Sequence, residues 1–179
     1  MEEDKREVNV VTLFQKAGLQ SHDSSVDPEE LRGVVVGLYF SAHWCPPCRQ
    51  FTPLLKQAYH AINASGKRLE IVFVSSDHDE KQFEDYFKSM PWLAVPFSAR
   101  AAQAAMASRF KVQGIPALVL IEDGEVVNAS ARGAVMKDPT GAAFPWKGQE
   151  DQAGGGGPNW YLIIAAVAFI LLKYVFKVI

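Results

Sequence analysis

Two cysteines separated by two residues are the part of this sequence best suited to chemistry. Cys45 and Cys48 are the only thiols in 179 residues. Two thiols at this spacing close as a disulfide and reopen as a dithiol, or supply half of a metal site. A structural zinc site needs four ligands, and the four histidines are scattered along the chain. The pair therefore favours redox chemistry without a bound metal or cofactor, with inert thiols or an incomplete metal site as alternatives.

The residues around the pair predict that it lies where a buried strand passes into a helix. Residues 34–40 form a near-continuous apolar run, typical of a strand covered on both faces. A helix is expected from Pro46 to about Ala64, because a proline in the first turn has no intrahelical hydrogen bond to lose. Unpaired N–H groups at a helix start favour a thiolate. We expect Cys45, at the exposed helix start, to be the nucleophile and the more buried Cys48 to resolve the mixed disulfide.

The rest of the sequence predicts a mixed α/β domain. Further elements are expected as strand 69–75, helix 79–90, helix 101–110, strand 117–121 and its hairpin partner 126–129. Strands and helices in this order indicate a central mixed sheet flanked by helices. After Arg132 the pattern weakens, and an extended segment that wraps the domain is expected.

Charge and the N-terminal composition exclude some classes of function. The formal net charge is -2, so there is no basic field for nucleic acid. The first seven residues are charged and mostly acidic, unlike a secretory signal or a transit peptide. We therefore expect the catalytic part to stay in the cytosol, where a closely spaced cysteine pair indicates redox or metal chemistry rather than a structural bridge.

The C-terminal residues predict a membrane anchor. Residues 160–172 are uncharged and mostly apolar, and as a helix they would span about 20 Å. Continuing to Ile179 gives about 30 Å, the thickness of the hydrocarbon core. Glycines at 154–157 are typical of a flexible linker. The expected parts are a domain at 1–148, a Gly-rich linker at 149–159 and a transmembrane tail anchor at 160–179.

This arrangement predicts a tail-anchored protein whose catalytic domain faces the cytosol. The span is short and tipped by Lys173 and Lys177, which favours the mitochondrial outer membrane over the endoplasmic reticulum. An amphipathic or core helix is the alternative for this segment. Asn63 and Asn128 lie in potential glycosylation motifs, and glycans on either would indicate a lumenal domain instead.

Several motifs resemble those of the thioredoxin superfamily. They are Trp44-Cys45-Pro46-Pro47-Cys48, Pro53 within the following helix, and Gly114-Ile115-Pro116 before an apolar strand. The longer stretches at 39–49, 90–97 and 137–146 resemble tryparedoxins and nucleoredoxins. The resemblance covers about residues 10–148. It implies a thioredoxin fold, with a cis bond before Pro116 and the Ile115 backbone beside the cysteines, to which the predicted transmembrane helix would be added.

The resemblance to tryparedoxins implies an electron carrier. Such a protein takes electrons from a low-molecular-weight dithiol, trypanothione, and passes them to peroxidases or other disulfide proteins. The resemblance to nucleoredoxins implies an alternative, a binding or regulatory module that depends on the redox state of its thiols. A third alternative is an iron–sulfur cluster held by the thiols of two chains.

The candidate site residues follow from the motifs and the resemblance. Cys45 and Cys48 are the candidate catalytic residues. The candidate substrate-binding residues are Trp44, Pro46, Pro47, Ile115, Pro116 and Arg132. The two prolines fix φ and hold both sulfurs in place, and the resemblance implies that Arg132 meets a substrate carboxylate, with a solvated surface arginine as the alternative.

Two departures from the family pattern concern the same site. Thioredoxins carry a buried acid six residues before the first cysteine, and Tyr39 stands there in this chain. A buried carboxylate base is therefore not expected at that position. Many tryparedoxins have Trp-Asp-Glu after the third strand, where this chain has Ser76-Asp77-His78. The contacts to a dithiol are expected to differ there, and His43 and Arg49 are expected at the surface near the site.

Overall fold

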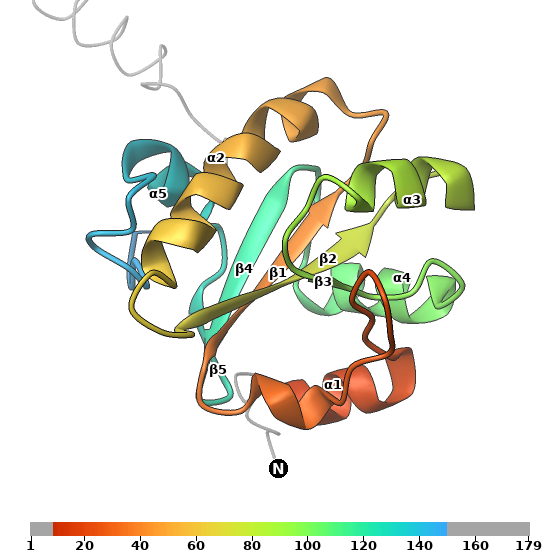
Figure 1. Ribbon diagram of the computed structural model, residues 1–179, viewed down its shortest axis with the longest axis horizontal. Coiled ribbons are helices and arrows are strands. Elements are labelled where there is room, and N and C mark those ends of the chain that lie inside the picture. Colours follow the sequence, from red (N-terminus) through yellow and green to blue (C-terminus); the bar gives the residue numbers. More distant parts are fainter. Residues whose placement is uncertain (1–8, 150–179) are drawn as a thin grey trace, which may run out of the picture.

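The computed structural model describes residues 9–149, which form one layered α/β domain. Its elements, in chain order, are α1 Val10–Ala17, the 3-10 helix η1 Pro28–Leu31, β1 Val35–Ser41, α2 Pro46–Ile62, β2 Leu69–Ser75, α3 Glu80–Phe87, β3 Leu93–Ala94, α4 Arg100–Arg109, β4 Ala117–Glu122, β5 Glu125–Asn128 and α5 Arg132–Lys137. The strands lie in the order β3-β2-β1-β4-β5, with helices on both faces of the sheet (Figure 1).

The sheet is mixed, as expected. β1 pairs in parallel with β2 and antiparallel with β4. β2 pairs in parallel with the short β3, while β4 and β5 form an antiparallel hairpin. Every residue of β1 and β2 is buried, which explains their apolar runs, because helices cover both faces of these two strands. The central strand β1 therefore leads from the interior directly to the cysteines.

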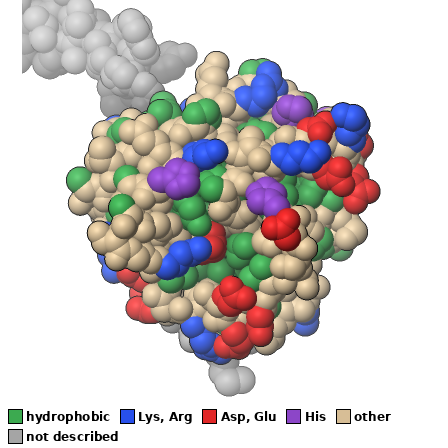
Figure 2. Space-filling view, in the orientation of Figure 1, with side chains coloured by type: hydrophobic (Ala, Val, Ile, Leu, Met, Phe, Trp, Pro, Cys, Tyr) green, Lys and Arg blue, Asp and Glu red, His purple; other side chains and the backbone are tan. Residues whose placement is uncertain are grey.

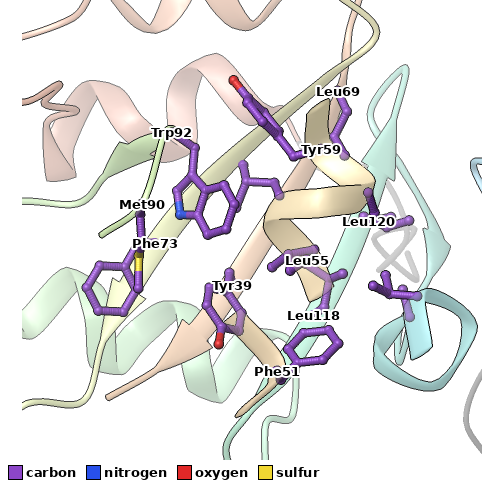
Figure 3. Packing of buried hydrophobic residues seen from close by; sticks show 14 of the residues in the cluster. Tyr39, Phe51, Leu55, Tyr59, Leu69, Phe73, Met90, Trp92, Leu118 and Leu120 are labelled. Atoms are coloured by element: carbon purple, nitrogen blue, oxygen red, sulfur yellow. The ribbon is translucent and has the colours of Figure 1, made fainter. Parts of the chain in front are cut away.

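Two apolar layers hold the helices on the sheet. On one face, Tyr39 and Phe73 pack against α2, α3 and the core tryptophans, as Figure 3 shows for Tyr39, Phe73 and Trp92. On the other face, Leu38 and Val72 pack with α1 and α4. Trp92 and Trp146 are both buried in this core. Because successive side chains of a strand point to opposite faces, β1 supplies both layers.

The segment after Arg132 differs from the expected extended chain. Residues Arg132–Lys137 form the short helix α5, which packs on α2. The helix has no side-chain cap and is only six residues long, so its sequence carries little helical signal. The Asp138 carboxylate then organises the following turns. It accepts hydrogen bonds from the amides of Ala142 and Ala143, from the Thr140 hydroxyl and from the Trp146 indole.

These bonds predict that Asp138 stabilises the fold in a pH-dependent way. They hold the pKa of the Asp138 carboxyl well below its usual range, with the Ala143 amide contributing most. The contribution is present above the ordinary carboxyl pKa of about 4 and is lost progressively as the pH falls below it. We expect Asp138→Asn to lower the free energy of unfolding by about 1 kcal/mol at pH 7. In urea titrations, the difference in free energy of unfolding between Asp138→Asn and the wild type should be smaller at pH 3 than at pH 7. A larger difference at pH 3 would contradict this account.

Gly141 lets the turn after α5 approach α2 closely. Its φ is +70°, and a Cβ atom there would lie 2.3 Å from the Cγ1 atom of Ile62. We expect Gly141→Ala to lower the free energy of unfolding by about 2–4 kcal/mol, from backbone strain and overlap together. Gly148→Ala is the matched control, because Gly148 has the same φ and nothing within 4 Å. Urea denaturation of both variants should show the larger loss of free energy of unfolding for Gly141→Ala. Equal losses would mean that Ile62 moves away from the new Cβ atom at no cost in stability.

Between residues 9 and 149, no helix is both long and apolar enough to cross a bilayer. The predicted anchor at 160–179, and nearly all of the linker before it, lie outside the described residues. On the face shown in Figure 2, acidic and basic side chains are interspersed, in keeping with the small net charge.

Candidate active site

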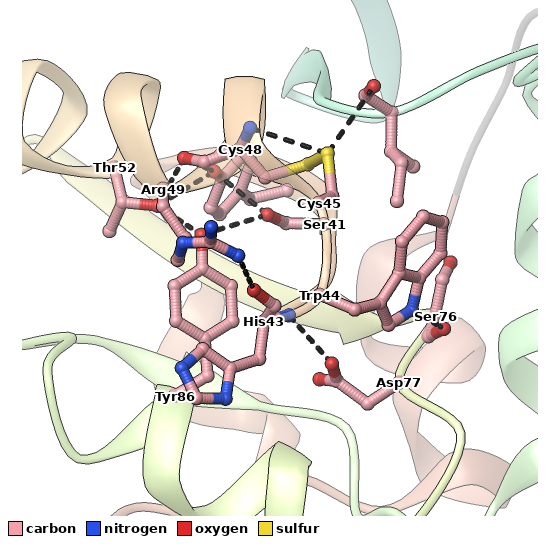
Figure 4. The surroundings of a disulfide bond; sticks show 12 residues. Ser41, His43, Trp44, Cys45, Cys48, Arg49, Thr52, Ser76, Asp77 and Tyr86 are labelled. Carbon is pink, nitrogen blue, oxygen red and sulfur yellow. Dashed lines mark hydrogen bonds between the residues drawn. A yellow bond between two sulfur atoms is a disulfide. The ribbon is translucent and has the colours of Figure 1, made fainter.

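The two cysteines form a disulfide where β1 leads into α2 (Figure 4). Cys45 is the N-cap of α2 and Cys48 lies one turn on, with the two Cα atoms 5.2 Å apart. The backbone N–H of Cys48 donates to the Cys45 sulfur at 3.3 Å. In the dithiol state, this N–H and the positive end of the helix favour a thiolate on Cys45. The strand-to-helix setting expected from the sequence is confirmed.

Cys45 is less accessible than the sequence suggested. It was expected at an exposed helix start, yet it is 3% exposed, and Cys48 is 0% exposed. Ile115 packs against the cysteines and Ala42, and its carbonyl oxygen lies 3.8 Å from the Cys45 sulfur. The exposed-start prediction was therefore wrong, because a loop distant in sequence covers the helix start. Cys45 is nevertheless the more exposed of the two cysteines, as expected, so an attacking sulfur reaches Cys45 more easily than Cys48.

The loop that covers the disulfide contains a cis peptide bond between Ile115 and Pro116. The resemblance implied this bond, and the structure confirms it. Pro46 and Pro47, by contrast, occupy the exposed first turn of α2 on the other side of the cysteines. The disulfide thus lies between a helix start and a backbone segment whose carbonyl faces the sulfur. Such a segment can accept a hydrogen bond from an extended partner chain.

Four buried hydroxyl groups lie behind Cys48, where the sequence predicted no carboxylate. Thr52 and Tyr39 each donate to the Cys48 carbonyl oxygen, at 3.0 and 3.4 Å. The Ser41 hydroxyl donates to that of Tyr39 at 2.9 Å, and the Tyr86 hydroxyl is hydrogen-bonded to both Ser41 and Thr52. Burial raises the pKa of Tyr39 well above its usual range, so its hydroxyl stays neutral. The interior beside the second cysteine is therefore polar and uncharged.

A buried carboxylate does reach the site, but from the end of β2. Asp77 is 0% exposed, and its Oδ1 accepts from the backbone N–H of His43 at 2.6 Å. Its Oδ2 accepts from the Ser75 hydroxyl at 2.8 Å. Asp77 therefore fixes the loop that carries Trp44 and Cys45. The sequence offered one signal, an aspartate two residues after a buried strand, but it did not show that the side chain would turn inward.

Trp44 stands beside the disulfide as an exposed apolar platform. Its side chain is the most accessible aromatic near the cysteines, at 46% exposure. The indole Nε1 donates to the Ser76 carbonyl oxygen at 3.0 Å, and the ring stacks on His78 with centroids 5.2 Å apart. The platform is thus held on one edge and on one face, which leaves the other face free for a partner.

The remaining predicted site residues divide into two groups. His43 is half-buried and stacks on Tyr86, while exposed Arg49 donates to the His43 carbonyl oxygen, so both lie near the disulfide as expected. Arg132 begins α5 and is half-buried, and its Nε has no hydrogen-bond partner among residues 9–149. No described contact joins Arg132 to the cysteines, so its role in substrate binding stays a prediction. Within the same residues, no group of three His, Cys, Asp or Glu side chains is placed to hold a metal ion.

Comparisons with known proteins agree with this geometry. Residues 33–126 match the family model described as Thioredoxin-like. The tryparedoxin of Trypanosoma brucei brucei is 43% identical over 130 residues, which cover 72% of this chain and 90% of the relative. The nucleoredoxin of Danio rerio is 42% identical over 129 residues, which cover 72% of this chain. A solved structure of tryparedoxin II complexed with glutathionylspermidine has 37% identity and a TM-score of 0.71, with coverage of 76% of this chain and 96% of that one.

The matched region makes up a different fraction of the two kinds of relative. It spans most of the tryparedoxin but only 31% of the length of the Danio rerio nucleoredoxin. The cysteine pair and these relatives support a thiol–disulfide oxidoreductase. By its fold, its matched family model and its relatives, the chain belongs to the thioredoxin-like family, with tryparedoxins and nucleoredoxins as homologues.

Proposed function

We propose that this protein is a thiol–disulfide oxidoreductase. It takes electrons from a low-molecular-weight, trypanothione-like dithiol and passes them to disulfides of proteins such as peroxidases. The observation that carries the proposal is the Cys45–Cys48 disulfide at the start of α2, facing the carbonyl of Ile115. The tryparedoxin relative and the complex of tryparedoxin II with glutathionylspermidine support a small peptide thiol as the donor.

The reductive half of the cycle begins at the Cys45 sulfur. A donor thiolate attacks it, a new S–S bond forms, and the Cys45–Cys48 bond breaks. Cys48 leaves as a thiolate and takes a proton from solvent. The second thiolate of the donor then attacks the donor sulfur of the mixed disulfide, which releases Cys45 as a thiolate. Two electrons have passed to the protein, and the donor leaves as an intramolecular disulfide.

The oxidative half runs through the same two sulfurs. The Cys45 thiolate attacks the target disulfide, and one target sulfur leaves as a thiolate that is then protonated. Cys48, having lost its proton, attacks the Cys45 sulfur, reforms the protein disulfide and releases the second target sulfur. The hydroxyls of Thr52 and Tyr39 hold the Cys48 carbonyl, which keeps the resolving thiol in place for this step.

The donor class can be tested by counting thiols. The oxidised full chain is mixed with trypanothione or with glutathione at equal total thiol concentration, and with thioredoxin reductase plus NADPH in a third arm. We expect trypanothione to be at least about tenfold faster than glutathione, because its second thiol reacts at an effective concentration in the millimolar range. Equal rates with trypanothione and glutathione would count against a dithiol donor. Reduction only in the arm with thioredoxin reductase would indicate that the electron donor is a protein.

A second candidate is a binding module controlled by the same disulfide. The nucleoredoxin match supports it, since the chain corresponds to about a third of such a protein. In this case the thiol state of Cys45 and Cys48 would control the binding of a partner rather than turnover. Slow turnover with every reductant, together with partner binding that differs between oxidised and reduced chains, would favour this candidate over an electron carrier.

We also propose, from the sequence, that residues 160–179 tether the domain to a membrane with the active site in the cytosol. The lysine-tipped, short apolar stretch supports the mitochondrial outer membrane over the endoplasmic reticulum. The test compares carbonate-resistant membrane association of the full chain with that of a chain ending at residue 159. Equal solubility of the two would count against the tether.

Glycosylation is a poor reporter of this topology. The Asn63 amide donates to the Leu69 carbonyl at 2.9 Å, and the fully buried Asn128 amide donates to the Trp146 carbonyl at 2.8 Å. Both amides are thus engaged in the folded domain, so the absence of a glycan would not establish the topology, whereas a glycan on either asparagine would still indicate a lumenal domain. Protease protection of the domain in intact membranes is the better measurement, and protection would contradict a cytosolic active site.

A further inference from the structure

The start of α2 offers the Cys45 sulfur a single backbone hydrogen bond. Cys45 is the N-cap, and the side chain of an N-cap residue can accept from the N–H groups of the second and third helical residues. Those residues are Pro47 and Cys48. The Cys48 N–H donates to the Cys45 sulfur at 3.3 Å (Figure 4), whereas Pro47 has no N–H to donate. One of the two donor positions therefore carries no hydrogen.

The other surroundings of the Cys45 sulfur do not replace the missing donor. The residue is 3% exposed, so little water reaches it. The Ile115 carbonyl oxygen lies 3.8 Å from the sulfur, and an acceptor in that place favours a thiol over a thiolate. Among residues 9–149, the Cys48 N–H is thus the one hydrogen-bond donor to the Cys45 sulfur.

We propose that Pro47 keeps the cysteine pair reducing, because it withholds a second backbone hydrogen bond from the Cys45 thiolate. The proposal rests on the proposed dithiol–disulfide cycle and concerns the side on which that cycle lies at equilibrium. A hydrogen bond to the thiolate stabilises the dithiol form, whereas the neutral sulfurs of the disulfide gain little from it. Without that bond the dithiol is less stable relative to the disulfide, so the pair passes its electrons on more readily.

Exchange with glutathione measures this equilibrium. One glutathione thiolate forms a bond to the Cys45 sulfur as the Cys45–Cys48 bond breaks, and the Cys48 thiolate takes a proton from solvent. A second glutathione thiolate attacks the sulfur of the bound glutathione and releases Cys45 as a thiolate. Two electrons have then passed to the protein, and oxidised glutathione leaves. A bond that stabilises the Cys45 thiolate shifts this balance toward the dithiol.

The Pro47→Ala variant restores the N–H at the second helical position. We expect the added charge-assisted bond to lower the midpoint of the pH profile for Cys45 alkylation by about one pH unit. Pro46→Ala is the matched control, because it adds an N–H at the first helical position, from which an N-cap side chain does not accept. Both prolines are exposed, and each variant loses one ring, so the difference between the variants isolates the donor.

The redox equilibrium should differ between the variants in a pH-dependent way. The full chains are equilibrated with reduced and oxidised glutathione, and mass spectrometry counts the protein thiols. At pH 5.5, where Cys45 is mostly a thiol, all three chains should agree within about twofold. At pH 9 the dithiol of Pro47→Ala should be favoured about five- to tenfold over the wild type, a change of about 20–30 mV toward a stronger oxidant. Pro46→Ala should match the wild type at both pH values.

The ionisable groups around Cys45 are the same in all three chains. They are Cys48 and Arg49 on α2, His43 in the loop before it, Asp77, His78 and Asp79 after β2, and Lys111 before the Ile115 loop. These groups affect the absolute midpoint at which Cys45 ionises. They cancel when the variants are compared, because alanine and proline carry no charge.

Two results would overturn the proposal. One is a Pro47→Ala chain that matches Pro46→Ala in both the alkylation midpoint and the equilibrium at pH 9. The other is a difference at pH 9 in which the amide introduced by Pro47→Ala, followed by nitrogen-15 NMR of the dithiol chain, does not shift with the titration of Cys45. That result would assign the change to flexibility rather than to a hydrogen bond.

The wild-type chain reports on the underlying function separately. If its disulfide exchanges with glutathione and its dithiol reduces insulin, while Pro47→Ala matches Pro46→Ala, only the inference about Pro47 fails. If the wild-type disulfide does not exchange with glutathione and the chain does not reduce insulin, the proposed function fails as well.

Discussion

The Cys45→Ser variant is expected to lose insulin-disulfide reduction, by a factor of about a thousand or more, because a serine hydroxyl cannot replace the attacking thiolate. Cys45 is the N-cap of α2 and is the less buried of the two sulfurs. An incoming disulfide therefore meets Cys45 first. The measurement is the turbidity of insulin reduced by the full chain with dithiothreitol as the electron source, and retained turnover would reject Cys45 as the nucleophile.

The Cys48→Ser variant is expected to behave differently from Cys45→Ser, and this difference assigns the two roles. Cys45 still attacks the target, but no second thiol releases it, so a mixed disulfide accumulates. Mass spectrometry without reductant should find the target joined to Cys45 in Cys48→Ser, and no adduct in Cys45→Ser. The reverse pattern would exchange the two roles. Circular dichroism of both variants checks that each remains folded.

The second large effect is expected at Asp77. Asp77→Ala removes the acceptor of the His43 N–H and of the Ser75 hydroxyl, and both donors are left inside the protein. Unsatisfied buried donors cost about 1–3 kcal/mol each, so we expect a loss of about 2–4 kcal/mol in the free energy of unfolding. The loop before Cys45 loses its anchor, and the rate of insulin reduction should fall by about tenfold.

Two further variants show whether Asp77 acts by holding this loop. Asp77→Asn keeps an oxygen that can accept from the His43 N–H, so it should recover most of the stability and rate. Asp79→Ala removes an exposed N-cap of α3 two residues away, and it should cost only about 1 kcal/mol with little effect on rate. Urea denaturation and insulin reduction measure both quantities. Equal effects of Asp77→Ala and Asp79→Ala would contradict the special role of the buried carboxylate.

The sequence predicted the elements whose signal is local. The strand at 69–75 has the expected bounds, and the helix after the cysteines ends within two residues of its expected end. Both have long apolar or amphipathic patterns that are independent of distant residues. The two-residue strand β3 was not predicted, because it exists through pairing with β2 and a bridge from Gln20 to Ala94. Such pairings leave no trace in a short sequence window.

The site shows the same division between local and distant signals. The spacing of Cys45 and Cys48 predicted a disulfide at a helix start, and the structure confirms that geometry. The burial of Cys45 could not be predicted, since it depends on Ile115, which is 70 positions away. The hydroxyl cluster behind Cys48 is similar, because Tyr86 comes from α3 and meets β1 and α2 only in the folded domain. Tertiary packing decides these features, and local pattern does not.

The central claim is that Cys45 and Cys48 cycle between disulfide and dithiol while passing two electrons to a target. A single-turnover experiment tests it most directly. The reduced full chain is mixed with excess insulin in the absence of any reductant, and alkylation followed by mass spectrometry counts the remaining thiols. The account predicts that each chain loses both thiols, forms the Cys45–Cys48 disulfide and reduces one insulin disulfide. Chains that keep both thiols while insulin stays oxidised would contradict it.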